Sequence, residues 1–188
     1  MLSGCVFGVL IGLSSQSNAQ STRGLWIAGG AEVLRVDRTT VPAGGLGNFT
    51  STTVAIGLYG GDVGIGYQFN DRFLFGGRFG FGIVSPENSD TVVAGHLGAH
   101  FEILFGAEKV RPFLLLEPGL EFVGNNSFTS RSNVGFHGQV GGGAHLFVTD
   151  SFSISPYGAF QFVEVPDWNR RTFALVVGAM ISGWVWKK

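Results

Sequence analysis

The amino-acid sequence predicts an all-β fold, an eight-stranded antiparallel up-and-down transmembrane β-barrel preceded by a signal peptide. In the strand-like segments, apolar side chains fall on one parity and nearly all charged and histidine side chains fall on the other. Only 13% of the 188 residues are charged, against about a quarter in a typical soluble domain. Beyond the N-terminal segment, no apolar run approaches the roughly 20 residues that a spanning helix needs. Because only helices and closed barrels satisfy every backbone group in lipid, these features together favour a barrel.

The chain is predicted to contain two regions, a signal peptide over residues 1–19 and a barrel over residues 20–188. An apolar run that begins at Cys5 is followed by small and polar residues, and we expect cleavage after Ala19. No Lys or Arg precedes the apolar run, so the sequence leaves open whether Met1 is the true start. The four residues that end at Cys5 also resemble a lipobox, and lipidation of this cysteine is the alternative.

Eight segments fit half-buried strands because their apolar residues recur at every second position. In chain order they are Leu25–Val36, Val54–Phe69, Phe73–Val84, Val92–Phe105, Val110–Val123, Val134–Val148, Phe152–Val163 and Thr172–Trp186. In the third segment, for example, Phe75 and Phe79 share one parity, whereas Arg78 lies on the other. We expect Phe75, Phe79 and Leu97 to face lipid and His100 to face the interior.

The connections between these segments alternate strictly between short and long. Residues 70–72, 106–109 and 149–151 form tight turns with Asn, Asp, Gly and Ser, which are turn-forming residues. Residues 37–53, 85–91, 124–133 and 164–171 form longer, mostly polar loops. Outer-membrane barrels alternate in this way, with short periplasmic turns and long outer loops, and an even strand number then places both termini in the periplasm.

Three short motifs carry a resemblance to a known family: Gly64–Asp71, Val110–Phe113 and Gly141–Asp150. On these residues the chain resembles the OmpA/OmpX-type family of small outer-membrane β-barrels. The resemblance implies a monomer in the bacterial outer membrane, surrounded by lipid and lipopolysaccharide and assembled by the barrel-insertion machinery. One departure concerns the C-terminus, where Trp186 is followed by two lysines, whereas such barrels usually finish on an aromatic residue.

The parity of the charged residues predicts a polar network in the barrel lumen. Its expected members are Glu32, Asp62, Arg78, His96, His100, Glu117, Glu121 and His137. The hairpin registers place Arg78 opposite a glycine on each neighbouring strand, within reach of Asp62. Only Arg35 and Glu164 fall on the apolar parity, at strand ends, where a charge that faces lipid costs least. The alternative is a set of unconnected polar groups solvated by trapped water.

The predicted function is structural or surface-interacting, without chemistry, because side chains fill the interior of an eight-stranded barrel. A narrow channel or small-ligand carrier is the first alternative, since the many interior glycines leave room in the lumen. A lipid A-modifying barrel enzyme is the second, although its base would have to face the membrane and all four histidines carry the luminal parity. We predict no catalytic residue and no cofactor.

The sequence also bears on metal and nucleic-acid binding. We predict no metal site, because His96 and His100 are four residues apart on a strand, about 13 Å, and another strand would have to intervene for them to share an ion. The net charge of −1 argues against a nucleic-acid partner. Four loop arginines are candidates for contact with lipopolysaccharide phosphates, with solvated loop charges as the alternative. They are Arg38, Arg131, Arg170 and Arg171.

Overall fold

The computed structural model describes residues 23–42, 48–56, 61–84, 92–106, 109–125 and 133–186. The expected signal peptide, Cys5 and Arg131 lie outside the described residues. The described elements are β1 (Gly24–Pro42), β2 (Asn48–Ile56), β3 (Gly61–Gln68), β4 (Phe73–Val84), β5 (Val92–Leu104), β6 (Val110–Asn125), β7 (Asn133–Thr149), β8 (Phe152–Val165), the 3-10 turn η1 (Pro166–Trp168) and β9 (Arg170–Trp186). None of the helices in this part of the chain is long and apolar enough to cross a membrane.

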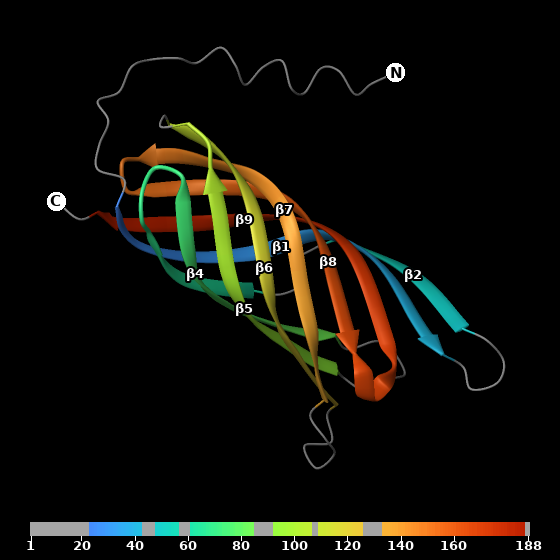
Figure 1. Ribbon diagram of the computed structural model, residues 1–188. Coiled ribbons are helices and arrows are strands. Elements are labelled where there is room, and N and C mark those ends of the chain that lie inside the picture. Colours follow the sequence, from blue (N-terminus) through green and yellow to red (C-terminus); the bar gives the residue numbers. More distant parts are fainter. Residues whose placement is uncertain are drawn as a thin grey trace, which may run out of the picture.

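The strands form one closed antiparallel barrel. Each strand from β3 to β8 pairs with the next in the chain, and β9 pairs back onto β1, beside which it lies in Figure 1. Both β2 and β3 pair with β1, β2 along its second half and β3 along its first, so the nine strands fill eight positions. Gly24 pairs with Trp186, and the described barrel therefore begins and ends at the same rim. The predicted eight-stranded antiparallel barrel is confirmed.

The largest difference from the predicted elements lies in residues 37–53, which were expected to form a long loop. β1 continues to Pro42 and β2 begins at Asn48, and the two extensions form a paired ribbon that projects beyond the other strands. Half of their residues are Thr or Ser, and β-branched threonines favour strands even where the surroundings are polar. Thr40 and Thr50 pair across the ribbon with their hydroxyl oxygens 3.3 Å apart. Polarity alone therefore gave the wrong assignment here.

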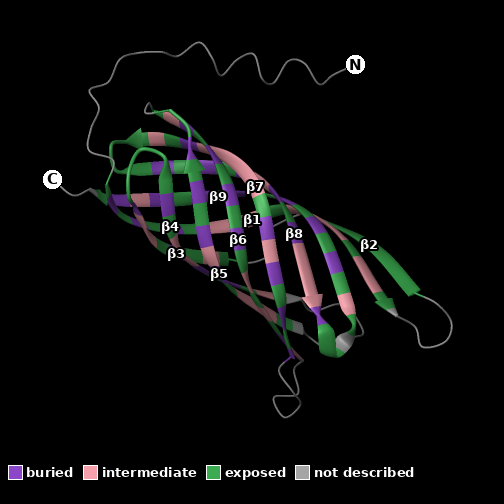
Figure 2. Ribbon diagram, in the orientation of Figure 1, coloured by how far each residue is buried: buried purple, intermediate pink, exposed green. Residues whose placement is uncertain are grey.

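Apolar side chains point outward and polar ones inward along most of the barrel. Phe75, Phe79 and Leu97 are 45%, 48% and 52% exposed, whereas His100 is completely buried. Figure 2 shows the resulting alternation of buried and exposed positions along the strands. Such a continuous exposed apolar surface far exceeds what a soluble monomer tolerates and matches the lipid-facing band of a membrane barrel.

A β-bulge in β1 corrects the expectation for Arg35. The register of β1 against β9 shifts between Glu32 and Leu34, so that Val33 is an extra residue on β1. Because side chains alternate along a strand, one extra residue exchanges the two faces beyond it. Glu32 and Arg35 therefore share the luminal face, and Arg35 donates from Nη1 to Gln161 Oε1 at 2.7 Å. Arg35 is a luminal residue and not a charge at the lipid interface.

Candidate functional site in the barrel lumen

Arg78 lies at the centre of the polar lumen. This β4 residue is 2% exposed, forms an ion pair with Asp62 of β3, and places Nη1 3.3 Å from Glu117 Oε2 of β6. The predicted hairpin registers are observed, since Arg78 lies opposite Gly64 on β3 and Gly98 on β5. One cation thus compensates two carboxylates from two other strands.

A chain of hydrogen bonds continues from Glu117 toward the rim that carries the short turns. Glu117 Oε2 lies 3.0 Å from His100 Nδ1, and His100 Nε2 lies 2.9 Å from Glu102 Oε1. Glu102 Oε2 then lies 2.8 Å from His145 Nε2, and His145 Nδ1 lies 2.7 Å from Ser155 Oγ. The predicted network did not include Glu102, His145 or Ser155. Strand parity could have identified Glu102 and His145, because both lie on the face of their strand opposite the apolar residues.

Ser155, His145 and Glu102 have the order of a nucleophile, a base and an orienting acid. All three are buried, and Ser155 Oγ also lies 3.2 Å from the hydroxyl of Ser153. A nucleophile needs space beside it for the atom that it attacks, and this hydroxyl is enclosed by its own hydrogen-bond partners. The group therefore satisfies buried polar atoms and links β5, β7 and β8.

Glu32 belongs to a second cluster, farther from the rim with the short turns than Arg78 is. Its carboxylate lies 3.1 Å from Arg35 Nη1 and accepts from Gln161 Nε2 at 2.7 Å. Gln161 Nε2 also donates to Gln139 Oε1 at 3.0 Å. These contacts tie β1, β7 and β8 together. Among the described contacts, Glu32 makes none with Arg78.

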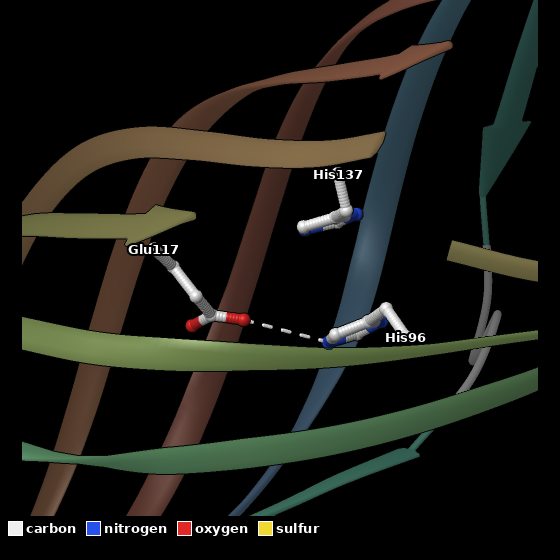
Figure 3. Close-up of side chains that lie close together, drawn as sticks. All are labelled: His96, Glu117 and His137. Carbon is white, nitrogen blue, oxygen red and sulfur yellow. Dashed lines mark ion pairs between the residues drawn. The ribbon is translucent and has the colours of Figure 1, made fainter. Parts of the chain in front are cut away.

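His96, Glu117 and His137 form a third group, which spans β5, β6 and β7 (Figure 3). His96 Nε2 lies 3.5 Å from Glu117 Oε1, and the imidazoles of His96 and His137 stack with centroids 4.5 Å apart at 7°. One nitrogen from each ring and one carboxylate oxygen all lie within 4.8 Å of one another. His137 Nδ1 also lies 3.2 Å from Glu121 Oε2. The prediction of no metal site depended on the distance between His96 and His100 along one strand. It does not apply to this group, whose members come from three strands.

The interior glycines accommodate side chains of neighbouring strands. A Cβ on Gly64 would lie 2.7 Å from Trp26 Cη2, and one on Gly98 would lie 2.8 Å from Glu117 Cγ. The Trp26 ring also stacks on His100, with centroids 5.0 Å apart. The expectation that these glycines leave open room is therefore wrong, because larger side chains occupy the space.

The described candidates for lipopolysaccharide contact lie near the rim opposite the one where the barrel begins and ends. Arg38 on β1 is exposed and pairs with the outward-facing Phe173 of β9, and Arg171 is exposed two residues away on β9. Arg171 is exposed and donates from Nε to Glu164 Oε1 at 2.9 Å. Arg170 carries the opposite parity of the same strand and is only partly exposed.

Comparison with solved structures places this architecture among known barrels. Neisserial surface protein A (NspA) aligns over 84% of this chain and 96% of its own, with a TM-score of 0.56 and 16% identity. Ail, the attachment invasion locus protein of Yersinia pestis, aligns over 85% of this chain and 98% of its own, with a TM-score of 0.52 and 15% identity. The N-terminal β-barrel domain of Pseudomonas aeruginosa OprF aligns over 87% and 99%, with a TM-score of 0.50 and 13% identity.

Sequence comparisons give no further assignment, since no protein-family model and no curated protein matches the chain. The likeness lies in the number, order and closure of the strands. The chain therefore has the fold of the small eight-stranded outer-membrane β-barrels of the OmpA/OmpX type.

Proposed function

We propose that this protein is an integral protein of the bacterial outer membrane with a structural or surface-interaction role and no catalytic chemistry. The observation that supports this most directly is the outward apolar surface. It includes Val63, Ile65, Phe79, Leu97, Leu120, Val140, Phe160 and Ile181, all exposed and drawn from seven of the strands. Burying such side chains in hydrocarbon stabilises the barrel by about 25 cal/mol per Å² of apolar surface.

The packed lumen favours a closed barrel rather than a channel. Arg78 and its carboxylate partners cross the middle of the lumen, and Trp26 and Trp184 are buried nearer the rim with the short turns. Trp184 Nε1 donates to Gln68 Oε1 at 3.0 Å, which joins β9 to β3. An ion that crossed the lumen would have to displace these paired groups.

Two measurements on the full chain test this proposal. In cells, we expect the protein in the outer-membrane fraction, with a C-terminal epitope reached by protease only after the outer membrane is permeabilised. In planar bilayers, we expect no conductance steps from the purified protein, with a known porin as the positive control. Reproducible single-channel steps would favour the narrow channel instead, and recovery in a soluble fraction would refute the membrane assignment.

Lipopolysaccharide is the partner that the outer rim fits best. Arg38 and Arg171 lie on adjacent strands and face outward, and a guanidinium binds phosphate with charge-assisted hydrogen bonds. We expect the double variant R38Q/R171Q to bind lipopolysaccharide aggregates several-fold more weakly than the parent. Arg72, exposed in a short turn at the opposite rim, supplies the control variant R72Q. Equal loss with R72Q would identify non-specific charge attraction.

A further inference from the structure

We propose that His96, Glu117 and His137 form a binding site for one divalent transition-metal ion of the zinc class, in the outer half of the lumen. Two imidazoles and a carboxylate are the ligands that such ions take, and three protein ligands leave one position for water. The three residues come from β5, β6 and β7, so a bound ion would crosslink three consecutive strands. This inference depends on the fold alone and is independent of the proposed surface role.

Two of the candidate ligand residues have a buried atom that no other described group satisfies. Glu117 Oε1 and His137 Nε2 are both buried and have no hydrogen-bond partner within the described structure. Glu117 Oε1 does face His96 Nε2, but their separation of 3.5 Å is longer than a good hydrogen bond. Buried polar atoms are almost always satisfied, so each orphan atom requires an explanation. A single cation bound between the three residues would satisfy both atoms.

The surrounding contacts hold the ligand groups in the required orientation. Glu121 lies 3.2 Å from His137 Nδ1, which leaves Nε2 of that ring as the free nitrogen. A carboxylate on the second nitrogen of a metal-binding imidazole is the usual outer-shell partner and fixes the tautomer. In the same way, His100 and Arg78 occupy Glu117 Oε2 and leave Oε1 free.

Gly80 positions the third ligand. A Cβ on Gly80 would collide with the His96 ring at Cε1 and would lie 2.8 Å from its Nε2. The imidazole therefore packs directly over the glycine. Figure 3 shows its ring pointing toward Glu117. The side chain of His96 is 19% exposed, so this ligand has contact with solvent and room to adjust.

Metal binding requires the stacked imidazoles to reorient. Zinc bonds of about 2.0–2.2 Å put tetrahedral ligand atoms about 3.3 Å apart. The donor atoms now lie within 4.8 Å of one another, so a bound ion would draw the nitrogens about 1 Å closer together. It would also tilt the two imidazoles out of their parallel stack, because an imidazole nitrogen binds a metal in the plane of its ring. Arg78 opposes a cation here, whereas Asp62 partly compensates Arg78 and Glu121 attracts the ion. We therefore expect micromolar rather than picomolar affinity.

The test titrates Zn²⁺ into the untagged, metal-stripped full chain folded in detergent micelles. We expect one equivalent of zinc to bind, measured by calorimetry and by competition with a chromophoric chelator. The midpoint of thermal unfolding should rise as zinc increases, because a ligand that binds only the folded state stabilises it. Substituted Co²⁺ should give the absorption of a tetrahedral or five-coordinate site with nitrogen and oxygen ligands.

Four variants separate this site from general histidine binding. H96Q and H137Q should abolish the one-to-one binding, and E121Q should weaken it about 10–100-fold as an outer-shell change. The control is H145Q, which removes a luminal histidine outside the site and should keep the stoichiometry and affinity. If H137Q fails to fold, H96Q alone decides, because its side chain is partly exposed. No binding at millimolar zinc, or binding by H96Q equal to the parent, would overturn the site.

Discussion

Replacement of Arg78 by Met tests the physical basis of the polar lumen. Methionine keeps much of the side-chain volume but removes the charge, and it leaves Asp62 and Glu117 buried beside an apolar group. Removing one partner of a buried ion pair costs about 3–5 kcal/mol, because the remaining charge is uncompensated. Glu117 keeps its contact with His100, whereas Arg78 is the only partner of Asp62 among the described ion pairs. We therefore expect a loss of about 3–5 kcal/mol that arises mostly at Asp62.

Glu117→Gln should destabilise the barrel less than Arg78→Met does. The glutamine variant removes one of two carboxylates from Arg78 and leaves the ion pair with Asp62 intact. The expected loss is about 1–3 kcal/mol, the cost of one unsatisfied buried group. R72Q in an exposed turn should change stability by less than about 0.5 kcal/mol.

The assay is equilibrium urea unfolding in lipid vesicles, followed by tryptophan fluorescence and by the mobility of the folded barrel on unheated gels. The double variant R78M/D62N should recover part of the loss, because an uncharged amide replaces the stranded carboxylate, and the cycle measures the coupling energy. R78M as stable as the parent, or no more destabilised than E117Q, would refute the reasoning.

Three further predictions concern packing, the bulge and the lipid face. G64A should cost about 1–3 kcal/mol by overpacking against the indole beside it, whereas G138A, with no atom within 4 Å of the added Cβ, should be neutral in the same assay. Deletion of Val33 removes the bulge but keeps the same side chains facing the lumen beyond it, so the barrel should still fold. Deletion of Val177 from the regular β9 would exchange the two faces of that strand and should prevent folding. The opposite result for the two deletions on unheated gels would contradict the observed register. For a mid-strand residue at the bilayer centre, L97R should lower the free energy of unfolding in vesicles by about 2–4 kcal/mol, well beyond the loss from L97A. Equal losses from the two variants would show that Leu97 does not face the bilayer centre.

The sequence was sufficient for the features that depend on strand periodicity and short turns. Phe75 and Phe79 face outward and Arg78 inward because successive side chains of a strand alternate, which is a local property of the backbone. The hairpin that joins β3 and β4 was also predictable, and Phe69 N donates to Phe73 O at 3.0 Å as the short turn requires. The cross-strand neighbours of Arg78 follow directly from that register.

Polarity misled the sequence analysis where strands continue beyond the apolar band. Thr40 and Thr50 read as loop residues because they are hydrophilic, yet they pair with each other in the extended ribbon of β1 and β2. Threonine favours a strand through its branched Cβ, and its polarity reports only its surroundings.

The sequence by itself determined that the chain closes into a barrel with ionisable groups inside and apolar groups outside, because that sorting needs only the two-residue period of a strand. The tertiary structure decided which groups meet. The inward turn of Arg35 depends on a bulge that appears only when β1 pairs with β9. The meeting of His96 with His137 depends on two successive strand registers, and one residue of slip in either would separate them.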